Sequence, residues 1–146
     1  MKNLSKGTLT IAATLLMTAT AAYAGDADIT IQNNTNTIIE DQNPTCLATG
    51  SFPATIQSGL SSVVSTTGGA TIYSCVVEYN RDDNNRGCKF VISRFYNSGF
   101  PPFILPYWEV PKVVTYEDTG MDCSHTFTSI SIDASGDFDV TLTVDD

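Results

Sequence analysis

The sequence predicts an all-β fold, a small disulfide-bonded β-sandwich or compact barrel of about seven to eight short, mostly antiparallel strands. Three observations predict this fold. Apolar and polar residues alternate with a period of two in several short segments, turn-forming residues separate these segments, and four cysteines follow an export signal. Windows with helical spacing also fit strands, or contain prolines that a helix interior does not tolerate.

Residues 1–24 have the features of a cleaved signal peptide. Lys2 and Lys6 supply the positive charge, an uncharged apolar segment follows, and residues 22–24 (Ala-Tyr-Ala) match the small-x-small cleavage pattern. The apolar segment is shorter than the roughly 20 residues of a membrane-spanning helix. We therefore expect one domain over residues 25–146, secreted or periplasmic, with no integral membrane segment in the mature chain.

Period-two alternation marks the predicted strands. They are 28–32, 37–40, 55–57, 62–65, 71–79, 89–95, 108–116, 126–133 and 138–144. The clearest hairpin joins the last two segments, and one face of its final strand carries Phe138, Val140, Leu142 and Val144. In the segment 71–79, the residues on one face are Tyr73, Cys75, Val77 and Tyr79.

The four cysteines predict two disulfides, because an even count behind an export signal is typical of an oxidising compartment. Three pairings are possible. Cys75 and Cys88 flank a predicted hairpin turn, which favours Cys75–Cys88 and leaves Cys46–Cys123. The alternative is a zinc site of four thiolates, but the sequence has no C-x-x-C spacing.

The charge of the predicted mature domain limits its partners. With 16 acidic and five basic side chains its formal charge is −11. Nucleic acids and anionic lipids are bound through Lys and Arg, so nucleic acid is excluded as a partner. A neutral glycan, a lipid or a protein remains as the class of ligand. The surplus of acids is either an acidic face for a basic partner or a solvated surface.

No motif predicts catalysis or a cofactor. The only histidine is His125, and the neighbouring Ser124 would point to the opposite face of a strand, so the two are a poor nucleophile–base pair. Weak calcium candidates are Asp133, Asp137 and Asp139 around a tight turn, although such residues are also ordinary hairpin chemistry. We therefore predict a non-enzymatic domain with no cofactor.

One segment, residues 95–108, is unusually rich in aromatic residues. It holds six of the 13 aromatic residues that follow residue 24, namely Phe95, Tyr96, Phe100, Phe103, Tyr107 and Trp108. Three prolines in the same stretch disfavour a regular ladder and predict a loop. The rings either bind a ligand, since exposed aromatic rings serve glycan, lipid and protein contacts, or they close one end of the core.

The resulting hypothesis is a secreted or periplasmic binding domain that contacts a glycan, lipid or protein through residues 95–108. Two alternatives remain. The signal peptide, size, disulfides and alternating terminal strands resemble chaperone-assembled pilins, which implies a self-assembling surface subunit, although the chain lacks the near-terminal tyrosine typical of that group. The acidic surplus is also typical of a periplasmic inhibitor or immunity protein against a basic enzyme or toxin.

Overall fold

The computed structural model describes residues 25–100, 104–133 and 135–146, which form 11 strands in two sheets and no helix. The predicted signal peptide, residues 1–24, and Phe103 lie outside the described residues. The strands are β1 (Asp26–Asn33), β2 (Ile39–Asp41), β3 (Thr45–Cys46), β4 (Thr55–Ile56), β5 (Ser61–Thr67), β6 (Ile72–Arg81), β7 (Gly87–Asn97), β8 (Tyr107–Trp108), β9 (Lys112–Glu117), β10 (Asp122–Ile130) and β11 (Phe138–Asp145).

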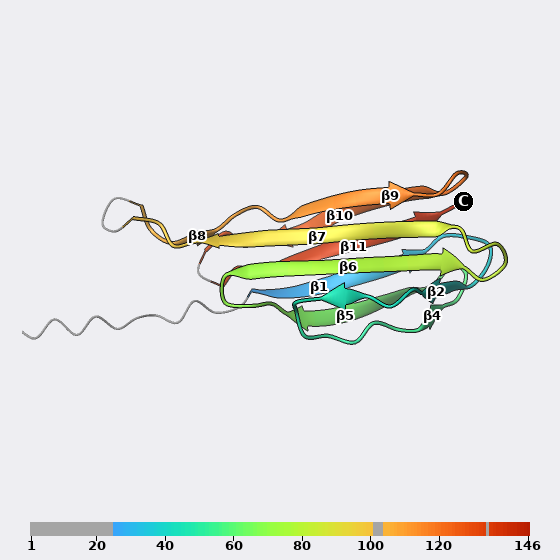
Figure 1. Cartoon of the computed structure of the whole chain (residues 1–146), viewed down its shortest axis with the longest axis horizontal. Helices are drawn as coiled ribbons and strands as arrows, with labels where there is room; N and C mark the ends of the chain where they lie inside the picture. Colours follow the sequence, from blue (N-terminus) through green and yellow to red (C-terminus); the bar gives the residue numbers. More distant parts are fainter. Residues whose placement is uncertain (1–24, 101–103, 134) are drawn as a thin grey trace, which may run out of the picture.

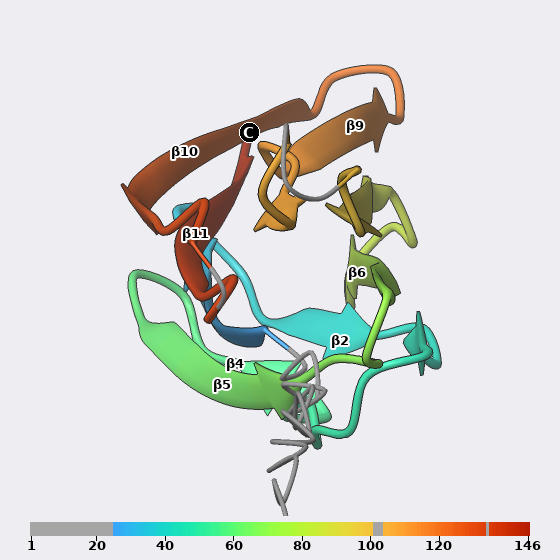
Figure 2. The ribbon, with the colours of Figure 1, turned by 90° about the vertical axis from the view of Figure 1, so that its left-hand side faces the viewer.

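The two sheets face each other as a sandwich, as the alternation predicts. The smaller sheet has the order β10-β11-β1-β5, and the larger has the order β4-β2-β6-β7-β8, with β3 also paired to β6 and β9 to β7. Figure 2 shows both sheets curved around a common interior. The strands outnumber the prediction because β3 was expected to be loop and β8 is separate from β9, and β3 and β8 have only two residues each, too few to show a period.

One pairing departs from the antiparallel rule. β1 lies between β5, which is antiparallel to it, and β11, which runs parallel to it from Ala27↔Phe138 to Asn33↔Val144. The first and last strands of the described chain are therefore neighbours in the middle of the smaller sheet.

The core lies between the sheets and is filled by the faces that the alternation predicts. On β6 and β11 the predicted inward residues are all buried, namely Tyr73, Cys75, Val77, Tyr79, Phe138, Val140, Leu142 and Val144. Ile29 and Ile31 on β1 and Phe90 and Ile92 on β7 complete the interior. Because side chains alternate along a strand, the outer residues of the same strands stay at the surface.

The disulfides are Cys46–Cys75 and Cys88–Cys123, so the predicted pairing is wrong. In the β6–β7 hairpin Cys88 faces Tyr79, whereas Cys75 faces Ile92, which keeps the two cysteines apart. The short strand β3 instead places Cys46 directly opposite Cys75. The second disulfide joins β7 of the larger sheet to β10 of the smaller one.

The two disulfides are compatible with an extracellular or periplasmic protein. Over residues 25–100, 104–133 and 135–146, no helix is long and apolar enough to cross a membrane.

Candidate binding site at the apolar finger

Residues 95–108 are here called the apolar finger, and their described parts, 95–100 and 104–108, continue the β7–β8 hairpin beyond the end of both sheets (Figure 1). Tyr96 pairs with Trp108, and Asn97 pairs with Tyr107. Farther out, Phe100 and Ile104 form an antiparallel bridge in which each amide donates to the other carbonyl at 3.0 Å. The predicted loop is thus a hairpin extension whose described outer part is held by its own backbone.

A glycine sets the path of the finger. The Gly99 amide donates to the Asn97 side-chain oxygen at 2.9 Å, and the Gly99 φ is +66°. A Cβ at this position would lie 2.3 Å from the carbonyl oxygen of Ile104. Only glycine satisfies both conditions, because L side chains rarely adopt this φ and there is no room for one here.

The outer part of the finger is apolar and uncharged. Leu105 is 77% exposed, Phe100 is 67% exposed and Ile104 is 53% exposed. No Asp, Glu, Lys or Arg occurs from Phe95 to Trp108. The finger is therefore a projecting apolar surface rather than a plug for the core.

The base of the finger, by contrast, belongs to the interior. Trp108 is fully buried, with its ring centroid 5.4 Å from that of Tyr96. The turn before β11 closes over the ring so tightly that a Cβ on Gly136 would lie 2.3 Å from it. Among the described residues the Trp108 indole nitrogen finds no hydrogen-bond partner. Trp108 therefore anchors the finger instead of contacting a ligand.

A buried arginine ties the same base together. Arg94, which is 1% exposed, donates from Nε to the Glu109 carbonyl at 2.6 Å. Its other two nitrogens donate to the carbonyls of Ser131, Gly136 and Asp137. Burial lowers the pKa of Arg94, while the negative charges of Asp137 and Asp133 act in the opposite direction. The Arg94 side chain thus links the segment after β8 to the turn before β11.

The structure divides the six predicted binding residues. Phe95, Phe100 and Tyr107 are exposed, Tyr96 is half-buried, Trp108 is buried, and Phe103 lies outside the described residues. The prediction missed four exposed aliphatic residues on or next to the finger, Ile104, Leu105, Val110 and Ile132. Ile104 and Leu105 lie within the apolar run of the sequence, but Ile132 reaches the base only through the backbone bond from Trp108.

The calcium candidates do not converge. The Asp133 carboxylate accepts hydrogen bonds from Ser131 and Ser135, and these bonds lower its pKa to about 2. Asp137 accepts the Asp26 amide at 3.1 Å, while Asp139 lies opposite Asp28 in the β1–β11 register. In the part of the chain that the structure describes, no three His, Cys, Asp or Glu side chains are placed to hold a metal ion.

The histidine lies on β10, away from the finger. His125 Nδ1 is 3.4 Å from the Thr115 hydroxyl oxygen, and its ring packs edge-on at 5.8 Å from Phe127. Ser124 is the next residue on the strand, so its side chain points to the opposite face.

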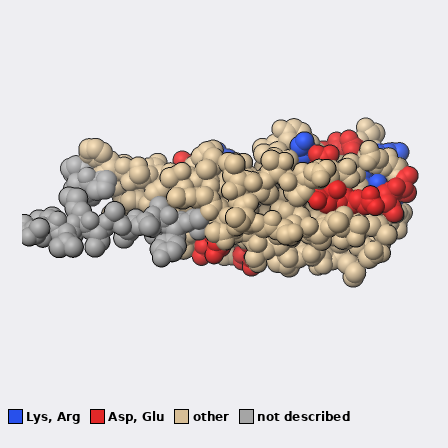
Figure 3. Space-filling model, turned by 60° about the horizontal axis from the view of Figure 1, so that its bottom comes forward, with Lys and Arg blue, Asp and Glu red and all other residues tan. Residues whose placement is uncertain are grey.

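Charge is concentrated at the other end of the molecule. Figure 3 shows a dense band of acidic side chains at the end opposite the finger. Asp82 and Asp83 lie in the β6–β7 turn there, and Arg81 makes ion pairs with Asp83 and Asp146. The acidic band and the uncharged finger therefore lie at opposite ends of the long axis.

Comparison with known proteins gives the fold and nothing more. No protein-family model matches the chain, and no curated protein sequence matches it. Among solved structures, IP-1A from Alcaligenes faecalis is similar, with a TM-score of 0.57 and 10% sequence identity over 86% of this chain and 93% of that chain. At this identity the likeness shows a shared fold alone.

Proposed function

We propose that this protein is an exported, non-enzymatic binding protein that inserts the tip of the apolar finger into the interface of a neutral or zwitterionic lipid membrane. The described residues of this tip are Phe100, Ile104 and Leu105. The observation that carries this proposal is the exposed pair Ile104 and Leu105 next to Phe100, on a projection without any charged side chain. Apolar side chains of this kind bind membranes in proportion to the apolar area that they bury.

The backbone of the finger suits an apolar environment. An unpaired N–H or C=O is costly in lipid, because no water is present to bond with it. The Phe100–Ile104 bridge pairs two amides and two carbonyls near the tip. Pro101, Pro102 and Pro106 have no N–H at all, so the finger carries fewer donors than an ordinary loop of its length.

Among the ligand classes of the sequence prediction, the composition of the finger favours a lipid over a glycan. A glycan site needs an accessible ring with polar groups beside it, whereas here the only tryptophan is buried and the exposed Phe100 lies next to the aliphatic Ile104 and Leu105. Tyr107, 38% exposed at the shoulder of the finger, combines apolar area with a hydroxyl, as aromatic residues at the headgroup level do. The formal charge of −11 disfavours anionic lipids.

Binding through this tip is expected to be weak and reversible. Each Leu, Ile or Phe side chain moved fully out of water contributes about 1.5–3 kcal/mol, and the tip has only three such described side chains. A single myristoyl chain likewise gives only marginal, reversible membrane binding.

Flotation with phosphatidylcholine vesicles tests the proposal. The mature chain is expected to float with the vesicles, and Leu105→Asp is expected to abolish flotation, because a charge at the tip opposes insertion. The matched control is Leu47→Asp, since Leu47 is 68% exposed but follows β3, which pairs with β6 and not with the β7–β8 hairpin that carries the finger. A parent chain that stays at the bottom of the gradient, or a Leu105→Asp variant that floats like the parent, would overturn the proposal.

A second candidate function is inhibition of a basic enzyme or toxin, which the acidic end favours. A partner held at this end should be captured from the periplasm or secretome at low salt and released at high salt. Asp82→Asn combined with Asp83→Asn should weaken the capture, while Leu105→Asp should not. Capture that survives both high salt and the double substitution would argue against this function.

The pilin-like alternative predicts polymers. β1 already lies between β5 and β11 of the same chain, so assembly would need an exchange of strands or another contact. Size-exclusion chromatography and electron microscopy of the purified mature chain separate the possibilities, because a surface subunit polymerises and a membrane-binding monomer does not.

A further inference from the structure

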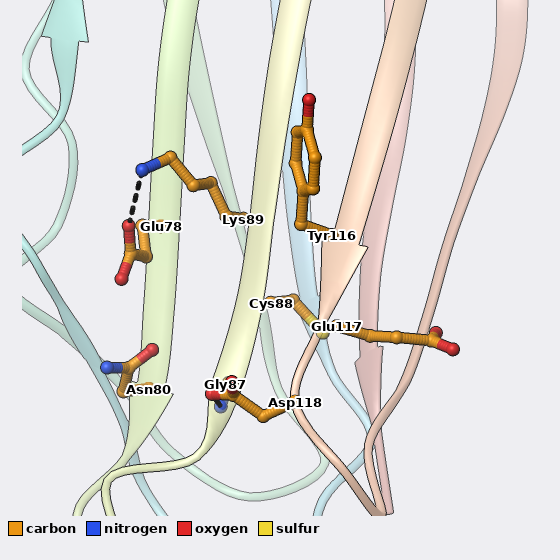
Figure 4. Close-up of a pocket in the computed structure, with 8 residues that line it drawn as sticks. All are labelled: Glu78, Asn80, Gly87, Cys88, Lys89, Tyr116, Glu117 and Asp118. Atoms are coloured by element: carbon orange, nitrogen blue, oxygen red, sulfur yellow. Dashed lines mark hydrogen bonds and ion pairs between the residues drawn. The ribbon is translucent and has the colours of Figure 1, made fainter.

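A hollow lies on the outer face of the larger sheet, at the end of β7 opposite the finger (Figure 4). Three strands build one of its walls, because Lys89 on β7 is paired with Glu78 on β6 and with Tyr116 on β9. All three side chains point to the outer face, since the next residues, Tyr79 and Cys88, point into the core.

Gly87 lets two strands approach closely at one side of the hollow. It is paired with Asn80, and a Cβ at this position would lie 2.0 Å from the Tyr79 carbonyl oxygen and 2.2 Å from Asn80 Oδ1. A depression of about 170 Å³ lies between Asn80, Asp118 and the wall of Lys89 and Tyr116. No larger residue can replace the glycine without displacing the Tyr79 carbonyl group.

The polar groups around the depression are held in place by hydrogen bonds and an ion pair, and they keep further donor and acceptor positions. One Asp118 oxygen accepts the Gly87 amide at 2.9 Å, and the Asp118 amide donates to the Gly87 carbonyl at 3.1 Å. The Lys89 ammonium is 3.3 Å from a Glu78 oxygen, which occupies one of its three donors. A carboxylate also has several acceptor positions, so both donors and acceptors remain for a ligand.

Tyr116 supplies an apolar surface beside these groups. It is 57% exposed and lines the depression beside Lys89, its partner on β7 (Figure 4). Glu117, in contrast, points away, and its carboxylate is 3.4 Å from the Cys123 amide nitrogen. An aromatic ring next to a paired donor and acceptor matches a sugar ring, which has an apolar C–H face and a rim of hydroxyl groups.

The geometry points to a second binding site, for one neutral sugar ring, formed by Tyr116, Lys89, Glu78 and Asp118 around the backbone of Gly87. The site takes one ring, because its volume lies below the roughly 300–1,000 Å³ of pockets that enclose a drug-sized ligand. It disfavours anions, because Asp118 and Glu78 repel them, and the ion pair of Lys89 with Glu78 offsets part of the negative charge that would attract a cation.

The site is independent of the finger. β7 is 11 residues long and joins the two, so they lie roughly 30 Å apart along a strand that rises about 3.3 Å per residue. Together they would let the protein contact a lipid surface at one end and a sugar at the other.

Nuclear magnetic resonance of the ¹⁵N-labelled mature chain tests this inference with the methyl glycosides of glucose, galactose and mannose. At least one glycoside is expected to shift the Gly87 and Lys89 amide signals saturably. Tyr116→Ala should weaken that affinity at least about fivefold, since it removes the stacking ring, while Tyr116→Phe should keep most of it. The control is Val114→Ala, on the same face of β9 and 50% exposed, which should bind like the parent.

Two further arms make the result decisive. Asp118→Asn keeps an acceptor for the Gly87 amide and removes a charge, so it should change glycoside affinity less than about twofold. Leu105→Asp should bind the glycoside like the parent, which separates failure of this site from failure of the finger. The inference is overturned if no glycoside gives a saturable shift, if Tyr116→Ala binds equally well, or if methylammonium binds and the glycosides do not.

Discussion

The guanidinium carbon of Arg94 lies 5.7 Å from the centroid of the Trp108 ring. It also lies 5.6 Å from the centroid of the Phe138 ring, so a buried cation is placed against two aromatic rings. All of the hydrogen bonds described for this guanidinium go to main-chain carbonyls. The orientation of the finger therefore depends on the buried side chain of Arg94, the residue directly before the finger.

Arg94→Lys is expected to destabilise the protein by roughly 2–4 kcal/mol, because a lysine cannot reach the same carbonyls and leaves several of them unpaired in the interior. Urea denaturation followed by circular dichroism measures this loss. Arg86→Lys is the control, since Arg86 is exposed and makes one hydrogen bond to the Thr119 carbonyl. Equal unfolding midpoints for the parent and Arg94→Lys would contradict the assigned role.

Trp108 and Tyr107 are neighbours with opposite roles. Trp108→Ala is expected to cost roughly 3–5 kcal/mol of stability, because it removes a fully buried ring, whereas Tyr107→Ala should cost far less. Thermal melts of the two variants make the comparison. If Tyr107→Ala melts as low as Trp108→Ala, the shoulder of the finger is part of the core and not a contact surface.

Gly136→Ala should destabilise the protein in two ways, through its φ of +66° and through a collision with the Trp108 ring. Gly59→Ala separates these effects, because Gly59 has a φ of +72° and nothing within 4 Å of its added Cβ. Urea midpoints should show a loss of about 1–2 kcal/mol for Gly59→Ala and a clearly larger loss for Gly136→Ala. Similar losses for the two variants would mean that the turn at Gly136 shifts to accommodate the added methyl group without disturbing the Trp108 ring.

The disulfide pairing can be read from a single digest. No Lys or Arg lies between Cys46 and Cys75, so trypsin should release residues 25–81 with an internal disulfide under non-reducing conditions. Residues 87–89 should remain linked to residues 113–146 through Cys88–Cys123. A species that joins 25–81 to either of the other two peptides would contradict the structure.

Each disulfide is expected to contribute about 3–4 kcal/mol, because the sequence separations of 29 and 35 residues are similar and the entropic gain varies slowly with loop length. Replacing both cysteines of either pair by alanine should therefore lower the unfolding midpoint by similar amounts.

Acid should remove one local contribution to stability. Hydrogen bonds from Ser135 and Ser131 lower the pKa of Asp133 to about 2 from its ordinary value of 3.8. Because the folded pKa is depressed, this contribution is complete above the unfolded pKa and is lost as the pH falls from about 4 towards 2. Asp133→Asn should flatten this part of the stability curve, and Ser135→Ala should raise the pKa of Asp133 in a carbon-detected titration.

The predictability of the fold follows the length of its strands. β6 and β11 have ten and eight residues, enough for alternation to fix which face is buried, and both predicted faces are correct. β3 has two residues and carries no period, so the contact that places Cys46 beside Cys75 could not be found. The parallel pairing of β1 with β11 was equally hidden, because alternation says which face is inside and not which strand lies alongside.

The candidate site was only partly predictable for a different reason. Aromatic and proline content located the finger, but content does not tell a contact residue from an anchor, and Trp108 is an anchor. Arg94 gave no signal, since a charged residue in an alternating strand is ordinarily expected at the surface. The hollow beside Gly87 is built by β6, β7 and β9, so it can be found only once the register of these strands is known.

The position of β1 also governs when the protein can finish folding. Asp26 and Asp137, which are in contact, are 111 residues apart in sequence. During synthesis β1 is complete before β11, so a β1 that has paired with β5 keeps its other edge open until β11 is available. An open strand edge can pair with another chain, so this edge is exposed to wrong partners until β11 covers it.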